Sequence, residues 1–308
     1  AVHWKSLYDA LKQKRPEHKV IYAATVTDIQ QDDQLNKVKL TINNQQEYLF
    51  DYCIFADGVN SIGRQHAFPQ IQPNFANTII WRGILSQVDQ TTSNYLLGRA
   101  VFHVFDKGHL LLYAIPNPGT TTPGTDYKVN WLLYEKADST HQLFKENPEL
   151  ARQNIVKGQM PQAYLSYLHS LAKKYFPDLT QKIIIATEEP FTQAVHEVLV
   201  PSYVQNNIAL VGDAGNLVRP HTAAGANKAL SDVIALGKEL AQNSDIKLAL
   251  SKWNKSQYEL GKNLFYSGQV LGETFVTNTP YWNTIDKEHM DKIWHSISDQ
   301  CWYAVKNN

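Results

Sequence analysis

The segment Val211–Asp232 (VGDAGNLVRPHTAAGANKALSD) constrains the fold of this 308-residue chain more than any other. An apolar run, Ile208–Val211, predicts a strand that ends at Gly212-Asp213, and small residues then lead into a helix predicted over about 223–242. A helix that starts in this way offers unpaired backbone N–H groups and the positive end of a dipole, which suit an electron-rich ligand. The simpler alternative is a strand–loop–helix crossover whose glycines only ease packing, but the density of unusual residues favours a binding site.

A second segment of the same kind, ADGVNSIGR (Ala56–Arg64), follows the short apolar run Asp51–Phe55. Ligands of open α/β sheets bind where loops leave the carboxyl ends of strands, and glycine lets the backbone approach a ligand closely. Asp57 could accept a hydrogen bond from a hydroxyl group or hold neighbouring backbone, and Arg64 could pair with a phosphate or with Asp57. Because Asp-Gly is also a common turn dipeptide, a purely structural turn is an equal alternative.

The patterns in the rest of the chain predict an α/β fold, in which an α/β layer is interrupted by a mostly antiparallel sheet and followed by C-terminal helices. We assign 1–66 and 191–242 to the layer, 67–190 to the sheet and 243–308 to the C-terminal helices. The clearest turn cluster is NPGTTTPGT, Asn117–Thr125. Further strands are expected at Val20–Thr27, Lys37–Ile42, Thr78–Leu85, Ala100–Phe105, His109–Ile115, Lys128–Tyr134 and Ile183–Ala186, and helices at Trp4–Lys14 and Pro161–Tyr175.

Charge, hydropathy and cysteine content argue against several classes of function. Lys+Arg and Asp+Glu number 29 each, and no basic run predicts binding to nucleic acid or to an anionic membrane. No apolar stretch approaches the roughly 20 residues that span a bilayer. Cys53 is expected to be a buried free thiol, and this cysteine usage suits a reducing compartment, so we expect a cytoplasmic protein. The histidines His103, His109 and His196 show no metal-ligand spacing with carboxylates, so no metal site is predicted.

Together, the two strand-end segments resemble the class A FAD-dependent aromatic-ring monooxygenases, which have the para-hydroxybenzoate hydroxylase fold. The shared pattern is D-G-x-x-S-x-x-R, followed by G-D-A, a proline and G-x-N at a helix start. Four shorter motifs resemble in particular the 2,6-dihydroxypyridine 3-monooxygenase branch. They are R-P-H-x-x-A-G-x-x-K-A, WRG at Trp81–Gly83, NWLLY at Asn130–Tyr134 and HWKSLYDAL near the N-terminus. The resemblance covers nearly the whole chain and implies that the layer binds FAD.

The resemblance assigns roles around the flavin. It implies that Asp213 binds the ribityl chain, that Gly212 allows close approach, and that Pro220 packs near the ring. The backbone N–H groups of three residues at the helix start would face the N1/C2=O edge of the ring: Gly225, Ala226 and Asn227.

Other polar residues would lie near the phosphates. The resemblance implies that Asp57 and Gly58 lie near the pyrophosphate and the route of NAD(P)H, and that Arg64 braces that loop. Arg219 could pair with a flavin phosphate or a carboxylate, and a salt bridge that braces its loop is at least as strongly favoured.

The implied reaction is hydroxylation of an aromatic or N-heteroaromatic compound with FAD, NAD(P)H and O₂ through a flavin C4a-hydroperoxide, in a protein that could be a homodimer. His221 is the catalytic candidate, because an imidazole beside the flavin could accept a phenolic proton; a structural histidine that orders its loop is an equal alternative. Residues of the sheet and of the strand that leaves it are the substrate-binding candidates: Trp81, Trp131, Tyr134, Phe191 and Gln193. Alternation gives each sheet aromatic about an even chance of facing the pocket.

The family's other fingerprint is a Gly-rich G-x-G-x-x-G motif in a βαβ dinucleotide unit, and it does not occur in these 308 residues. Two interpretations follow. The chain is a fragment without its N-terminal ADP-binding unit, or it is a non-catalytic remnant of the family that binds a ligand or partner without flavin. If the unit is absent, the pyrophosphate loses a helix N-terminus, and we expect the polypeptide to purify colourless.

Overall fold

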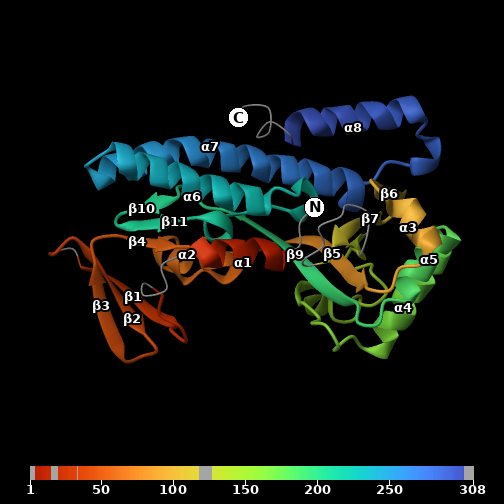
Figure 1. The fold of residues 1–308 in the computed structure, drawn as a ribbon, viewed down its shortest axis with the longest axis horizontal. Coiled ribbons are helices and arrows are strands. Elements are labelled where there is room, and N and C mark those ends of the chain that lie inside the picture. The colour runs from red at the N-terminus through yellow and green to blue at the C-terminus, as the bar shows by residue number, and fades with distance from the viewer. Residues whose placement is uncertain (1–3, 15–19, 33, 118–126, 302–308) are drawn as a thin grey trace. The chain divides into compact units, whose positions relative to one another are not determined.

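The computed structural model describes residues 4–14, 20–32, 34–117 and 127–301 (Figure 1). The chain divides into two compact units. Unit 1 comprises Ala1–Lys19, Asn77–Val195 and Glu273–Asp286, and unit 2 comprises Val20–Ala76, His196–Gly272 and Lys287–Asn308. The chain therefore passes several times between the units.

Unit 2 contains two small sheets. An antiparallel sheet is formed by β1 (Val26–Asp32), β2 (Lys37–Ile42) and β3 (Gln46–Phe50). The second sheet has the order β10-β11-β4, in which β11 (Ile208–Leu210) pairs in parallel with β4 (Cys53–Phe55) and antiparallel with β10 (Val204–Gln205). Two further strands meet in this unit, since β12 (Asn216–Leu217) pairs with the C-terminal end of β9 (Phe191–Leu199).

Helices complete unit 2. The short helix α2 (Ile62–Ala67) follows β4, and the long helices α6 (Gly225–Gln242) and α7 (Ile246–Gly272) lie side by side (Figure 1). The last described helix is α8 (Lys287–Cys301). The core of the unit joins the two sheets to these helices through buried apolar side chains, including Cys53, Phe55, Leu210, Leu236 and Trp253. Removal of this apolar surface from water is the main force that holds the strand ends in place.

Unit 1 is built on the antiparallel strands β5 (Asn74–Leu85), β6 (Ala100–Phe105), β7 (Gly108–Pro116) and β8 (Tyr127–Lys136), with the sheet order β9-β5-β8-β7-β6. Its α-helices are α1 (Trp4–Lys14), α3 (Gln90–Leu96), α4 (Gln162–Tyr175) and α5 (Asp178–Ile185). A π-helical turn, Glu273–Thr277, also belongs to this unit.

The two faces of the unit 1 sheet differ because side chains alternate along each strand. In the register of β5 and β8, Trp81 pairs with Leu133 and Gly83 pairs with Trp131. The Trp81 ring contacts Tyr164 and Tyr167 of α4, with ring centroids 6.1 and 5.9 Å away. This face of the sheet is therefore covered by helix.

Most predicted elements are confirmed. The helix Trp4–Lys14 and the strands Lys37–Ile42 and Ala100–Phe105 form with the predicted bounds, and the sheet of unit 1 is antiparallel as expected. The predicted turn cluster Asn117–Thr125 lies outside the described residues apart from Asn117. The α/β fold with an antiparallel sheet and C-terminal helices agrees with the expectation from sequence.

Two strand predictions are wrong. Ile183–Ala186 belongs to the end of helix α5, whose buried residues Thr180, Ile183 and Ile184 recur at helical spacing. Helical periodicity of burial here overrides the β propensity of three consecutive isoleucines. The predicted strand Val20–Thr27 begins only at Val26, because Ala23 has a left-handed φ of 51°.

Among the described residues, no helix is long and apolar enough to cross a membrane.

Candidate functional site

The two strand-end segments meet at one edge of unit 2. Phe55 of β4 pairs with Leu210 of β11, and the Val211 N–H donates to the Phe55 carbonyl at 3.0 Å. Because the strands are parallel, the loops that begin at Asp57 and Gly212 leave the sheet from neighbouring carboxyl ends. This is the position at which open α/β sheets bind ligands.

The first loop is ordered by its own side chains. The Oδ2 atom of Asp57 accepts hydrogen bonds from the backbone N–H groups of Ile62 at 2.9 Å and Gly63 at 3.3 Å, and Ser61 caps the same short helix. Gly58 has a left-handed φ of +73°, and no atom lies within 4 Å of the position of a Cβ there. Asp57 thus holds backbone, one of the two roles predicted for it, and Gly58 leaves open space beside the turn.

Arg64 links the first loop to the second. Its side chain is fully buried, and its guanidinium donates hydrogen bonds to the carbonyl oxygens of Asp213 at 3.4 Å, Ala214 at 3.0 Å and Val59. Burial lowers the pKa of the guanidinium, and the nearby Asp57 carboxylate opposes this effect. The predicted bracing role therefore has a direct structural counterpart, with backbone carbonyls rather than a phosphate as the partners.

The second loop turns at Gly212 and presents the carboxylate of Asp213. Gly212 has φ +60°, a conformation that favours glycine. Asp213 is half-buried, and no described residue donates a hydrogen bond to its carboxylate oxygens. Burial raises the pKa of Asp213, and the charge of Lys228 lowers it. A partly buried carboxylate without a donor is suited to accept hydrogen bonds from the hydroxyl groups of a ligand.

Arg219 braces the loop that carries Pro220 and His221. Its guanidinium forms a bidentate, buried ion pair with Glu197, with N–O distances of 2.6 and 3.1 Å. Gln269 donates to the same carboxylate at 3.0 Å. The ion pair corresponds to the loop-bracing alternative for Arg219. Pro220 is exposed, and His221 is partly exposed in the 3-10 turn that follows Arg219.

The start of α6 follows this loop and is uncapped. Gly225 is the first residue of the 18-residue helix, and no side chain accepts a hydrogen bond from its first backbone N–H groups. No atom lies within 4 Å of the position of a Cβ on Gly225, and Ala226 and Asn227 are exposed. The helix thus presents open space, small residues and the positive end of its dipole, which together fit an electron-rich ring edge.

The substrate-binding candidates belong to unit 1 and do not share one face of its sheet. Trp131 donates through Nε1 to the Thr187 hydroxyl at 2.9 Å, and Trp81 donates to Glu135 at 2.9 Å, on the face covered by α4 and α5. The alternation along β8 places Tyr134 on the opposite face from Trp131. The three aromatics therefore cannot all line one pocket, and helix packing accounts for the burial of the two tryptophans.

The opposite face of the same sheet gathers polar and aromatic side chains. Tyr134 stacks on His109, with ring centroids 4.4 Å apart. Arg82 donates to the Gln193 side-chain oxygen at 3.0 Å and lies over the Phe191 ring, 5.4 Å from its centroid. Two of the candidates, Phe191 and Gln193, are thus brought together by Arg82, which was not predicted.

Sequence reasoning also missed four residues of unit 2. Glu197, Tyr203, Lys228 and Asp232 are each at most 5% exposed, and each pairs with a residue of the second loop or of α6. The i,i+4 spacing of Lys228 and Asp232 was a usable signal, because such pairs meet on one side of a helix. The burial of the pair was not evident from that spacing.

Comparisons with known proteins point to FAD-binding families. Residues 180–245 match a protein family described as FAD binding domain, and residues 75–197 match one described as FAD binding domain-like. The 2,6-dihydroxypyridine 3-monooxygenase of Paenarthrobacter nicotinovorans is 24% identical over 84% of this chain and 65% of its own length. A salicylate hydroxylase of Pseudomonas putida is 23% identical over 78% of this chain and 54% of its own length. The chain thus spans less than two thirds of the length of these relatives.

The fold is also similar to that of a relative of this kind. The solved structure of 2,6-dihydroxypyridine-3-hydroxylase from Arthrobacter nicotinovorans matches 90% of this chain and 70% of its own chain, with a TM-score of 0.76 and 22% sequence identity. The family resemblance predicted from the two strand-end segments is thereby confirmed. In sequence and in fold, this chain is similar to the class A FAD-dependent aromatic-ring monooxygenases.

Proposed function

We propose that the protein hydroxylates an aromatic or N-heteroaromatic compound, with FAD as cofactor and NAD(P)H and O₂ as co-substrates. The observation that carries the proposal is the half-buried carboxylate of Asp213, which has no hydrogen-bond donor among the described residues and lies in the same loop segment as the uncapped start of α6. A carboxylate for hydroxyl groups and a helix start for an electron-rich ring edge are the two kinds of contact that a flavin with its ribityl chain requires.

Unit 2 would hold the cofactor. Asp213 would accept hydrogen bonds from the ribityl hydroxyls, and the backbone N–H groups at Gly225–Asn227 would bind the electron-rich edge of the flavin ring. The open space beside Gly58 would admit the pyrophosphate side of the cofactor, with Arg64 keeping both loops in register. FAD, when bound and reduced by NAD(P)H, supplies the activation of O₂, and the protein supplies position and a site protected from water.

Unit 1 would bind the substrate on the face of its sheet that carries Tyr134, Phe191 and Gln193. Arg82 adds a cation beside these rings and has no carboxylate partner among the described residues. His221 would accept the proton of a substrate hydroxyl and so raise the electron density of the ring that is attacked. The names of the relatives support a hydroxylated aromatic or N-heteroaromatic substrate, since one acts on 2,6-dihydroxypyridine and another on salicylate.

The test begins with the product of the whole gene. We expect a yellow protein with a flavin absorption band, and NAD(P)H oxidation that rises when dihydroxypyridines or hydroxybenzoates are added. Labelled O₂ should place one oxygen atom in the product. Oxidation without labelled product would contradict hydroxylation, and a whole-gene product that never takes up FAD would contradict the proposal altogether.

The Asp213→Ala variant localises the site. Loss of a carboxylate that accepts hydrogen bonds from ribityl hydroxyls should weaken FAD binding by about ten- to hundredfold. The matched control is Asp28→Asn, which changes an exposed carboxylate of β1 in the same unit. Equal FAD dissociation constants for wild type, Asp213→Ala and Asp28→Asn would show that Asp213 does not contact the cofactor.

A further inference from the structure

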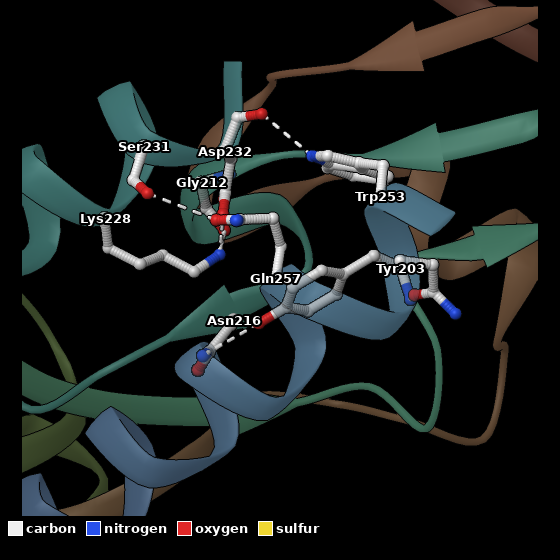
Figure 2. A network of polar contacts seen from close by, with 9 residues as sticks. Tyr203, Gly212, Asn216, Lys228, Ser231, Asp232, Trp253 and Gln257 are labelled. Atoms are coloured by element: carbon white, nitrogen blue, oxygen red, sulfur yellow. Dashed lines mark hydrogen bonds and ion pairs between the residues drawn. The ribbon is translucent and has the colours of Figure 1, made fainter. Parts of the chain in front are cut away.

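A buried ion pair lies directly behind the Gly212 turn (Figure 2). Lys228 and Asp232 are one helical turn apart on α6, and the Nζ–Oδ2 distance is 2.6 Å. The side chains are 1% and 0% exposed, so neither charge is stabilised by bulk water. Buried ion pairs are no more stable than apolar residues of the same volume, because desolvation offsets their attraction. A contribution to stability alone therefore does not account for this pair.

The pair holds both polar groups of a single backbone residue. The Gly212 N–H donates to Asp232 Oδ2 at 2.9 Å, and Lys228 Nζ donates to the Gly212 carbonyl at 3.4 Å. The two peptide groups that flank the Gly212 Cα are thus fixed from one side by side chains of α6. Since Gly212 has φ +60°, these contacts hold the left-handed turn that sets the direction of Asp213.

The pair is itself held by residues of other elements. Trp253 of α7 donates through Nε1 to the Asp232 carbonyl at 2.8 Å, and Lys228 Nζ lies 4.4 Å from the centre of the Tyr203 ring. Asn216 donates to the Tyr203 hydroxyl at 3.0 Å, as Figure 2 shows. Because the supporting contacts come from α7 and from the segments on both sides of β11, the pair has little freedom to move away from Gly212.

Lys228 also affects Asp213 directly, because its positive charge lowers the pKa of the Asp213 carboxyl group. Burial of Asp213 favours the protonated carboxyl group. The charge of Lys228 opposes this effect and favours the ionised carboxylate, which accepts hydrogen bonds. The same side chain thus influences both the direction and the charge of Asp213.

We propose that Lys228 and Asp232 are positioning residues that clamp the Gly212 peptide groups and so hold Asp213 in place for the cofactor. The clamp itself concerns only residues of this chain. Its benefit to FAD binding rests on the proposed function. Nothing in this role requires either side chain to touch the cofactor or the reacting atoms.

Two double variants separate the clamp from general stability. K228M/D232L replaces the pair with apolar side chains of similar volume and leaves the Gly212 N–H without its acceptor. K228M/D232N also removes both charges but keeps an amide oxygen that can accept from Gly212. The two variants differ only in the side chain at position 232. Neither contains an isolated buried charge, whereas a single Lys228→Met protein would keep the Asp232 charge without its partner and would be prone to misfold.

The first readout needs no cofactor. Amide hydrogen exchange in the segment 209–214 of the cofactor-free protein should accelerate by about ten- to hundredfold in K228M/D232L, which corresponds to loss of a hydrogen bond to a charged group. In K228M/D232N the exchange should stay nearer to that of wild type. Equal exchange in wild type and K228M/D232L would overturn the clamp.

The second readout is FAD affinity, measured by quenching of flavin fluorescence. We expect K228M/D232L to bind FAD about tenfold or more weakly than wild type, with K228M/D232N in between. Wild-type affinity in K228M/D232L, with accelerated exchange, would overturn the role in cofactor positioning. If the wild-type whole-gene product does not bind FAD, the proposed function fails, and the exchange data still decide the clamp.

Two controls exclude trivial explanations. Leu250→Ala removes an apolar side chain of the unit 2 core and no hydrogen-bonding group, so it lowers global stability while the polar groups of the pair and of Gly212 remain present. K5M/D9L removes an i,i+4 pair of equal length, 2.6 Å, that is 57% and 44% exposed on α1. Neither control should change exchange at 209–214 under native conditions or the FAD dissociation constant. A similar change in Leu250→Ala would show that global stability alone explains the effect.

Discussion

Arg64 Nη1 donates a hydrogen bond to the carbonyl oxygen of Ala214, 3.0 Å away, although the two residues are 150 positions apart in the chain. The same guanidinium reaches the carbonyl of Asp213 in the second loop and that of Val59 in the first. The buried arginine therefore supplies the hydrogen bonds that water would otherwise donate to carbonyl oxygens of both loops. The two sequence motifs of the site are therefore parts of one hydrogen-bonded structure.

Replacement of Arg64 by Met should destabilise unit 2 by about 3 kcal/mol, because buried carbonyls lose the charged donor that satisfies them. Urea denaturation measures the change in the free energy of unfolding. Arg152→Met is the matched control: Arg152 is 55% exposed and pairs with Glu149 on the surface, so the expected change is about 0.5 kcal/mol or less. Equal midpoints for Arg64→Met and Arg152→Met would contradict the linking role.

Gly212 and Gly237 should respond in opposite directions to substitution by alanine. At Gly212 an alanine must adopt φ +60°, and its Cβ would lie 3.2 Å from the Cβ of Ala229, so we expect a loss of about 1–3 kcal/mol. Gly237 lies inside α6 with no atom within 4 Å of an added Cβ, and alanine there should stabilise the protein by about 0.5–1 kcal/mol. Thermal or urea unfolding measures both, and a stabilised Gly212→Ala protein would refute the strained turn.

Sequence alone predicted the elements whose periodicity and burial agree. The helix Trp4–Lys14 and the strand Ala100–Phe105 have the expected bounds because their local preference and their apolar pattern point to the same structure. The run Ile183–Ala186 shows the opposite case. Its side chains prefer strands, but Ile183 and Ile184 are buried on one side of a helix, and packing decided the outcome.

In the candidate site, too, some features could be predicted from the sequence and others could not. Asp57 and Asp213 could be placed at strand ends because their neighbours in sequence are apolar strands followed by glycine or small residues. The contact from Arg64 to Ala214 and the burial of Lys228 could not be predicted, because both depend on segments that meet only after folding. The separation of Trp131 from Tyr134 follows from alternation along β8, but which of the two faces is covered by α4 depends on packing that the sequence does not show.

His109 should make the stability of unit 1 depend on pH. Burial lowers its pKa from 6.5 to about 3, so the folded protein holds a neutral imidazole where the unfolded chain binds a proton. This group therefore contributes stability above pH 6.5, and the contribution is lost as the pH falls toward 3; at pH 5 the loss is about 2 kcal/mol. Urea titrations of wild type and His109→Gln between pH 7 and 5 measure it, and equal pH slopes for the two proteins would contradict the burial of a neutral His109.

A double-mutant cycle on the ion pair between Arg219 and Glu197 distinguishes the two roles considered for Arg219, bracing of its loop and binding of a cofactor phosphate. If Arg219 braces the loop, Arg219→Met and Glu197→Gln should each destabilise the protein by about 3 kcal/mol, since each leaves the partner charge buried and unpaired. The double variant should then lose much less than the sum, with a coupling of about 2 kcal/mol or more in a double-mutant cycle. The exposed pair Lys39–Glu47 is the reference, with a coupling expected at about 0.5 kcal/mol. Additive effects at Arg219 and Glu197 would show that the loop is held by other contacts and would favour a cofactor phosphate as the partner of Arg219.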